Sequence, residues 1–426
     1  MGETEANRQV QAITLDYGAD DPLILEVDRE TLVADWRGPA GTTADQARQA
    51  VEAALATPPD GPPLEAHVVP GDRVVIALVG DVPQAAAVVT AVTGRLAAAG
   101  VPREDTLLLH APAIERLAGD HRAREMPTGT GGSEVFDAAV DAQTSYVAAD
   151  DAGQPIYLAR RLVDADVVVG IGGFSWDASL GTQSPEGELW PACGRQACHR
   201  EFVRTLASRG RRAVTAWRSA NQEAAWHLGI TASLRIVAGR GDTLVAARFG
   251  LPDVAARAAA VDARAWRPRV AAAAALTVAS LSSPGGGLSV LRKAVAAAAR
   301  VTQPAGTICI ASRLAEKPGV VFRRWREGAP VEGLVREALG SGDPALVEDA
   351  FQTRFFARAL GDRRLVLLSD LGQEAVEELE LGYAATPEVV ERLAHRAASI
   401  AVLHEADRLL PRGISRLPQS PTRDTR

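Results

Sequence analysis

Lysine is nearly absent from this sequence: of its 46 basic residues only Lys293 and Lys317 are lysines, and the others are arginines. Any chemistry that needs a primary amine is therefore restricted to two positions. Cysteine is scarce as well, with Cys193, Cys198 and Cys309 as the only three. An odd number in a long chain does not suggest a disulfide framework, and four residues separate the first two where zinc and redox pairs have two. We expect three free thiols.

Long apolar runs and an excess of positive charge are also lacking. No stretch of about 18 apolar residues is present, and the first ten residues, MGETEANRQV, have no apolar core. The formal net charge is −7, with acidic and basic residues interleaved along the chain. A protein that binds the phosphates of nucleic acid or of an anionic membrane surface would be basic. The sequence therefore predicts a cytoplasmic protein that binds neither nucleic acid nor a membrane.

The apolar residues that are present, 47% of 426, suffice for two hydrophobic cores, so two domains are expected. Residues 71–84, GDRVVIALVGDVPQ, are typical of a buried parallel strand that ends in a turn. The next apolar positions fit an amphipathic helix that stops at Gly100 and Pro102, and a second strand follows at 105–113. This order predicts a parallel sheet with helices on both faces.

The stretch QPIYLARRLVDADVVVGIGG repeats the order, with a helix to about Asp164 and a strand after it. Ligands of such sheets bind at the carboxyl ends of the strands. Here those ends are expected at 80–84, 110–116 and 170–199.

A second α/β pattern begins after residues 250–268, an alanine- and arginine-rich stretch with two prolines that we interpret as a connecting segment. Strand and helix patterns then alternate in AALTVAS, LSVLRKAVAAAARVT, PAGTICIAS and RRLVLLSDLG. We therefore predict a first domain over 10–250, a second over 265–411 and a polar, disordered tail over 412–426.

Two glycine loops, GIGGF at 170–174 and SSPGGGLSV at 282–290, are candidate dinucleotide sites. Neither matches Gly-x-Gly-x-x-Gly with a helix directly after it. GTGG at 129–132 lacks the Gly-Lys-Ser/Thr ending of a phosphate loop, and GFSWD at 173–177 lacks the second glycine of a serine-hydrolase elbow. An α/β transferase or oxidoreductase that uses the glycine loops stays open as one alternative.

Six segments carry a family resemblance by their order and spacing: PLEAHVVPGDRVVIALVGD, LAAAGVPREDTLLL, QPIYLARRLVDADVVVGIG, PAGTICIAS, RRLVLLSDLGQE and IAVLHEADRLLPR. From about Ala12 to Pro411 the chain resembles the lactate racemase-like proteins that use a nickel pincer cofactor. The resemblance implies two α/β domains with mostly parallel sheets and an active site in the inter-domain cleft. It also implies that a 2-hydroxy acid loses and regains hydride through a nickel pincer nucleotide, with two histidines as base and acid.

That chemistry requires a lysine tether, a histidine on nickel, paired bases, and cations that hold a carboxylate. At the first strand end the family has Asp-x-x-Arg-Pro; Asp81 matches, but GDVPQAA lacks the arginine. At the second the family has Thr-His-Arg-Pro, and Glu115 and Arg116 take the places of His and Arg. His110 lies about five residues earlier. Asp81 and Arg116 are thus candidate cofactor-binding residues, and Glu115 and His110 are candidate catalytic bases.

The third strand end departs furthest from the family. The second catalytic His falls near Ser175, a further candidate cofactor-binding residue. The tethering Lys falls near Ser184 or Pro185, neither of which can form the tether. His199 lies within a few residues of the family's nickel-ligating His and is the candidate metal ligand. In the second domain, glycines replace the Lys and Asp of the family's Tyr-Pro-Lys-Asp.

Two functions are compatible with the resemblance and these losses. The first is a lactate racemase-like protein that lacks the pincer-dependent chemistry and keeps a cleft for a small molecule, such as a hydroxy acid, or for a partner. The second is an active isomerase, a racemase or epimerase of a 2-hydroxy acid, with a noncovalent nickel cofactor and relocated bases such as Glu115, His110 or His199. The sequence leaves the cofactor and the oligomeric state open. In either case we expect four side chains to line one inter-domain cavity: Asp81, Glu115, Ser175 and His199.

Overall fold

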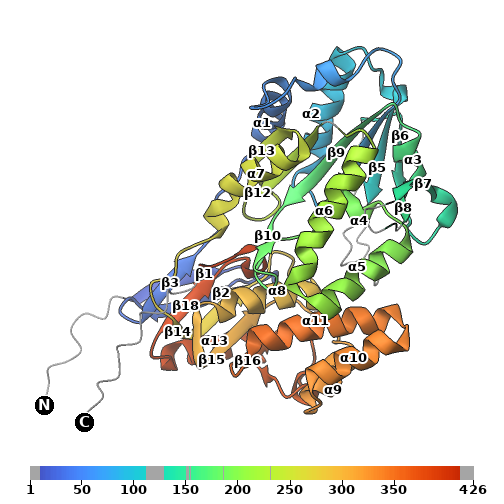
Figure 1. Cartoon of the computed structure of the whole chain (residues 1–426). Helices are drawn as coiled ribbons and strands as arrows, with labels where there is room; N and C mark the ends of the chain where they lie inside the picture. The colour runs from blue at the N-terminus through green and yellow to red at the C-terminus, as the bar shows by residue number, and fades with distance from the viewer. Residues whose placement is uncertain are drawn as a thin grey trace, which may run out of the picture. The chain divides into compact units, whose positions relative to one another are not determined.

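The computed structural model describes residues 10–111, 129–149, 153, 155–185, 187–230 and 232–412. The chain forms two compact units, each with its own six-stranded sheet (Figure 1). The first unit takes Met1–Arg37, Arg267–Lys317 and Arg358–Arg426, and the second takes Gly38–Trp266 and Pro318–Ala357. The expected class, α/β with mostly parallel sheets, is confirmed.

The sheet of the second unit has the order β13-β12-β9-β4-β5-β6. Its strands are β4 (Val74–Val79), β5 (Thr106–Ala111), β6 (Gly132–Val135), β9 (Val167–Phe174), β12 (Ser233–Ala238) and β13 (Leu244–Gly250). All neighbours are parallel except β12 and β13. Every residue of the central strand β4 is buried, which explains its unbroken apolar sequence VVIALV. The strands predicted within 71–84, at 105–113 and at 167–173 correspond to β4, β5 and β9.

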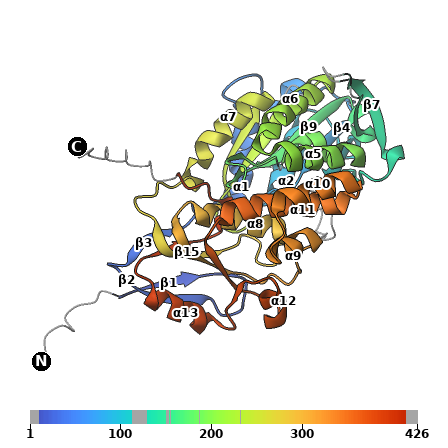
Figure 2. The same cartoon turned by 60° about the horizontal axis from the view of Figure 1, so that its bottom comes forward.

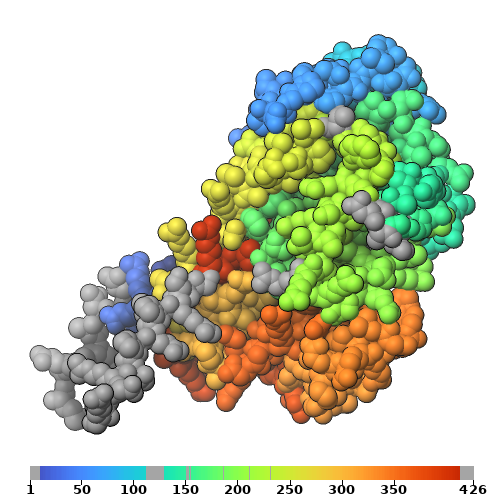
Figure 3. All heavy atoms as spheres, in the orientation of Figure 1, coloured from blue at the N-terminus to red at the C-terminus, as the bar shows by residue number. Residues whose placement is uncertain are grey.

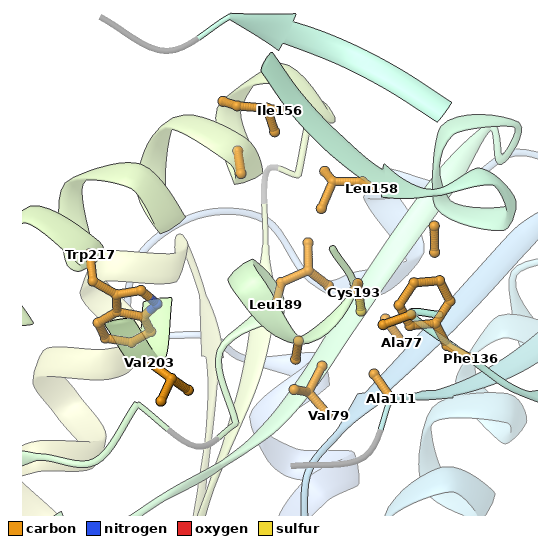
Figure 4. Packing of buried hydrophobic residues seen from close by; sticks show 14 of the residues in the cluster. Ala77, Val79, Ala111, Phe136, Ile156, Leu158, Leu189, Cys193, Val203 and Trp217 are labelled. Atoms are coloured by element: carbon orange, nitrogen blue, oxygen red, sulfur yellow. The ribbon is translucent and has the colours of Figure 1, made fainter. Parts of the chain in front are cut away.

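Helices cover both faces of this sheet. On one side, called here the α1/α2 face, α1 (Ala44–Ala56) and α2 (Ala85–Ala98) pack on Val74, Ile76 and Leu78. On the other, the α5/α6 face, the alternate residues Val75, Ala77 and Val79 pack against helices. Those helices are α4 (Leu189–Ala192), α5 (Gln196–Arg209), α6 (Arg211–His227) and α11 (Pro344–Leu360). Figure 4 shows side chains of this core.

Two segments of the second unit differ from the sequence prediction. The stretch before Asp164 is not one helix but a strand, β8 (Pro155–Ala159), followed by the four-residue α3 (Arg160–Val163). β8 pairs with β7 (Thr144–Ala149), a partner that local periodicity does not reveal. Residues 250–268, predicted as a connecting segment, contain the helix α7 (Pro252–Asp262), which packs against β12 and β13. Proline at its start and five alanines explain this helix.

The sheet of the first unit has the order β17-β16-β15-β14-β18-β3 and is parallel throughout. Its strands are β3 (Leu32–Trp36), β14 (Ala274–Ser280), β15 (Thr302–Ala311), β16 (Arg364–Leu368), β17 (Gly382–Tyr383) and β18 (Ile400–Leu403). A hairpin of β1 (Val10–Leu15) and β2 (Leu23–Asp28) packs on one face with α13 (Pro387–Arg396). Figure 2 shows α8 (Leu288–Ala299) on the opposite face.

The two units are not continuous in sequence, whereas the predicted domains 10–250 and 265–411 are. Strand β3 belongs to the first unit because it pairs with β18. Three helices from beyond residue 317 pack in the second unit, namely α9 (Val320–Arg326), α10 (Val331–Ser341) and most of α11. The short α12 (Gln373–Glu378) lies in the first unit. The predicted tail lies outside the described residues from 413 onward.

The described helices include none with the length and apolar character of a membrane span. Figure 3 shows the outer faces of α6, in light green, and α7, in yellow, at the surface of the second unit. Polar residues alternate with apolar ones along α6, so only part of its circumference is buried.

Candidate functional site

Three strands of the second unit end side by side at the carboxyl edge of its sheet. The N–H of Gly80, just after β4, donates to the Ala111 carbonyl at the end of β5 (2.9 Å). A Cβ on Gly173 of β9 would lie 3.0 Å from the Asp81 carbonyl oxygen. Asp81 is exposed, and Ser175 directly follows β9 and is half-buried. The fold therefore brings Asp81 and the end of β9 together at the edge where ligands of parallel sheets bind.

The loop after β9 folds back on itself. Strands β10 (Trp176–Asp177) and β11 (Thr182–Gln183) form a short antiparallel hairpin, and the Ser184 N–H donates to the Ser175 carbonyl (2.9 Å). The Asp177 carboxylate, fully buried, accepts the N–H groups of Ser179 and Leu180 and closes the turn. Ser184 is fully buried as well. Ser175 and Ser184, which lie near the positions that the resemblance gives to a catalytic His and a tethering Lys, are thus joined by a backbone hydrogen bond.

A second contact fixes the next part of this loop against β9. Gly172 and Gly187 pack backbone to backbone, and a Cβ on Gly172 would collide with the Gly187 carbonyl oxygen. Gly187 has φ +81°, a left-handed conformation that glycine adopts without strain. Arg235 on β12 donates from Nη1 to the same carbonyl (2.6 Å). The loop is therefore held against the sheet at a place where only glycine fits.

A buried ion pair completes this attachment. Glu188 and Arg235, with side chains 8% and 6% exposed, form a salt bridge through Oε2 and Nη2. Asn221 of α6 donates from Nδ2 to Glu188 Oε2 (2.8 Å), and Gln183 donates from Nε2 to Oε1 (3.1 Å). The Asn221 side-chain oxygen also accepts the Trp190 N–H (2.9 Å). We call Gln183, Glu188, Asn221 and Arg235 the loop clamp, because they tie the loop to both α6 and β12.

His199, the candidate metal ligand, lies in the first turn of α5 and is 2% exposed. Its Nε2 lies 2.6 Å from the Pro191 carbonyl oxygen, so this nitrogen carries the proton and donates. Its Nδ1 is buried and has no hydrogen-bond partner among the described residues. Burial lowers the pKa of His199, and the bond to Pro191 opposes that shift only in part. The ring is therefore neutral at pH 7 and serves as a donor inside the protein.

His110, a candidate base, lies on the other face of the sheet from His199. His110 alternates along β5 with Leu109 and Ala111, which belong to the core on the α5/α6 face. His110 therefore points to the α1/α2 face, whereas α5 and His199 cover the opposite one. Glu115 and Arg116 lie outside the described residues. In the parts of the chain that are described, no three His, Cys, Asp or Glu side chains group as ligands of a metal.

The three cysteines are free, as expected. Burial raises the pKa of Cys193 and of Cys309 to about 12, and it also raises the pKa of Cys198. Thiols of this kind are not ionised at neutral pH and are poor nucleophiles. Cys193 is part of the core on the α5/α6 face (Figure 4). These residues therefore contribute to packing.

Sequence reasoning missed the loop clamp. The one available signal is Arg235, an arginine inside the mostly apolar strand sequence SLRIVA. A buried arginine needs an acidic partner, but its partner Glu188 lies 47 residues earlier in a polar loop. Trp176, whose Nε1 donates to the Ala263 carbonyl (2.8 Å), likewise serves the packing of the loop.

Comparison with known proteins places part of this chain in a family. Residues 17–181 match the model of the lactate racemase N-terminal domain family. No curated protein matches.

Among solved structures, the chain is similar to the lactate racemase apoprotein from Thermoanaerobacterium thermosaccharolyticum. The two share 17% identity with a TM-score of 0.73, over 94% of this chain and all of that one. A protein from Thermotoga maritima, solved by a structural genomics consortium, is 12% identical with a TM-score of 0.60, over 89% of this chain and all of that one. Identities this low establish a common fold and no more. Residues 17–181 therefore match the lactate racemase N-terminal domain family, and the chain as a whole has the fold of a lactate racemase apoprotein.

Proposed function

We propose that this protein lacks the pincer-dependent racemase chemistry and keeps a small-molecule site at the carboxyl edge of the second unit's sheet. The observation that carries the proposal is the pair Ser175 and Ser184, near the positions that the resemblance gives to a catalytic His and a tethering Lys. Ser184 is fully buried, and its N–H donates a hydrogen bond to the Ser175 carbonyl. A serine hydroxyl has no amine with which to form a tether, and it is not a base at neutral pH.

The distribution of lysine supports the same conclusion. Lys293 and Lys317 are the only lysines of the chain, and both belong to the first unit. The unit that carries the loop after β9 has arginine as its only strongly basic residue type. Arginine stays protonated in proteins and does not replace lysine as a covalent tether.

The nickel pincer nucleotide does not fit the residues around His199. Nickel binds a lone pair on an imidazole nitrogen, but Nε2 carries a proton that it donates to Pro191. The lone pair of Nδ1 is enclosed, because His199 is 2% exposed and the Nδ1 atom is buried. His199 would have to leave its place under α4 before either nitrogen could reach a metal.

The proposed ligand is a small polar molecule, such as a hydroxy acid, that binds where β4 and β9 end. Asp81 offers an exposed carboxylate there, and Ser175 offers a hydroxyl that can donate or accept. A ligand hydroxyl could donate to Asp81. Neither nucleic acid nor a membrane surface is proposed as a partner, because the chain has a net charge of −7.

Purified protein tests the first half of the proposal. We expect no stoichiometric nickel, no added mass from a covalent adduct, and no change of enantiopure lactate or related 2-hydroxy acids. Stoichiometric nickel that is lost in His199→Ala, together with racemisation, would establish the alternative, an active isomerase with a noncovalent nickel cofactor.

Thermal shifts test the second half. Saturating ligand stabilises a protein by a few kcal/mol, so a panel of 2-hydroxy acids should raise the melting temperature of the wild type. Asp81→Asn should weaken that shift. Asp164→Asn is the matched control, because Asp164 is an exposed carboxylate just before β9, at the opposite edge of the sheet. Shifts by NAD or nucleotides alone would instead favour a glycine-loop transferase or oxidoreductase.

A further inference from the structure

A small cavity lies beside the loop clamp in the second unit. Its volume is about 30 Å³, and glycines of β9, Ala225 of α6 and Ile230 form part of its wall. Its polar wall consists of Glu188, Asn221, Ser233 and Arg235. The cavity is far smaller than the roughly 300 Å³ or more of ordinary ligand pockets, so a substrate-sized molecule does not fit.

Two polar atoms of this wall have no protein partner. Ser233 and Arg235 are 7% and 5% exposed, and Ser233 Oγ and Arg235 Nε are buried without a hydrogen bond to any described residue. The two residues are two positions apart on β12, so their side chains leave the same face of the sheet. Buried donors that stay unpaired destabilise a protein, and native structures rarely contain them.

The remaining groups of the wall are already satisfied. Arg235 uses Nη1 on the Gly187 carbonyl and Nη2 on Glu188. Glu188 accepts hydrogen bonds from three donors, which come from Gln183, Asn221 and Arg235. The carboxylate and the guanidinium neutralise each other, so the wall carries no net charge that would attract an ion.

We propose that this cavity binds one or two ordered water molecules, which bridge Arg235 Nε and Ser233 Oγ. A water molecule needs about 10–15 Å³ of such space and two to four polar partners, and the cavity offers both. Water accepts the Nε–H of Arg235 and either donates to or accepts from the Ser233 hydroxyl. The bound water then completes the hydrogen bonds of Arg235, the β12 member of the loop clamp, and of Ser233 on the same strand.

A high-resolution crystal structure of the full chain tests this proposal. In the wild type we expect an ordered water at about 2.7–3.2 Å from both Arg235 Nε and Ser233 Oγ. In Ser233→Ala the water should lose occupancy or shift toward Arg235, while the Glu188–Arg235 pair stays in place. Ser233→Val, which removes the hydroxyl and extends into the cavity, should expel it.

Ser369→Ala is the matched control, because Ser369 Oγ is also a buried hydroxyl without a partner but does not line this cavity. It should leave the water unchanged. A dry wild-type cavity, or Arg235 Nε bonded to a protein atom, would overturn the proposal. An anomalous peak in the cavity after a bromide soak would overturn it as well, because the cavity would then be an anion site.

Discussion

Each unit has a loop that follows an inner strand of its six-stranded sheet, but the two loops are held in place differently. In the second unit, the loop after the central strand β9 buries its own polar groups, including Asp177, Ser184 and Glu188. In the first unit, the loop after β14, SSPGGG at 282–287, is mostly half-buried and precedes the 12-residue helix α8. A single carboxylate, Asp407, anchors its start by accepting the N–H (2.7 Å) and the hydroxyl of Ser282.

The difference shows two ways in which a loop can be fixed without regular secondary structure. The loop clamp uses charges that are stable in the interior only because each has a partner, so it is stable as a whole and sensitive to single changes. The Asp407 anchor uses hydrogen bonds between a buried carboxylate and Ser282, which lies in a half-buried loop. Four experiments, from the largest expected effect to the smallest, test this contrast and the burial of His199.

Glu188→Ala should have the largest effect. It leaves the Arg235 guanidinium buried without its partner, and breaking a buried pair in this way costs about 3–5 kcal/mol. Urea unfolding followed by tryptophan fluorescence suits the measurement, because six of the seven tryptophans lie in the second unit. The double variant Glu188→Leu, Arg235→Met should recover most of the loss. A loss below about 1 kcal/mol in Glu188→Ala would mean that solvent reaches the clamp.

Gly172→Ala and Gly287→Ala compare the two loops directly. A Cβ on Gly172 meets the backbone of Gly187, which cannot move without shifting the loop, so about 1–3 kcal/mol should be lost. A Cβ on Gly287 meets the end of the flexible Glu316 side chain (2.5 Å), which can turn away, so the change should stay within about 0.5 kcal/mol. Equal losses in unfolding free energy would contradict the contrast.

Asp407→Asn should cost about 1 kcal/mol, the value of a typical hydrogen bond. The amide keeps an oxygen for the Ser282 N–H, and its NH₂ can donate to the Ser282 hydroxyl in place of the bond lost. Hydrogen exchange should show faster exchange at 282–287 and no change in the loop after β9. Altered exchange in that second loop would show that the anchor acts beyond its own unit.

His199→Gln should change the pH dependence of stability more than stability at pH 7. The folded pKa of His199 is lowered, so the unfolded chain binds the proton more readily and wild-type stability falls as the pH drops below the unfolded value of about 6.5. Glutamine can still donate to the Pro191 carbonyl but does not titrate. Urea midpoints at pH 7.5 and 5 should therefore fall less in His199→Gln than in the wild type. An equal decrease of the urea midpoint in the two proteins would contradict a neutral, buried His199.

Local patterns predicted much of the fold. The apolar runs of β4 and β9 and the helical sequence patterns of α2 and α8 marked these elements because each pattern lies within one short, continuous stretch of the chain. Strand β8 was missed because it depends on its partner β7, and helix α7 was missed because its alanine-rich sequence has little periodic contrast. The candidate site was predicted only in part: the sequence pointed to Asp81, Ser175 and His199 but not to the loop clamp.

By itself the sequence determined the type of each strong element, the scarcity of lysine and the serines near the positions of the family's His and Lys, since composition and short-range order are read directly from the chain. Only the tertiary structure decided that Glu188 pairs with Arg235 across 47 residues, that His110 and His199 point to opposite faces of a sheet, and that His199 has a buried lone pair. The reason is physical. The charge state and the accessibility of a side chain depend on its neighbours in space, and those neighbours come from distant parts of the chain.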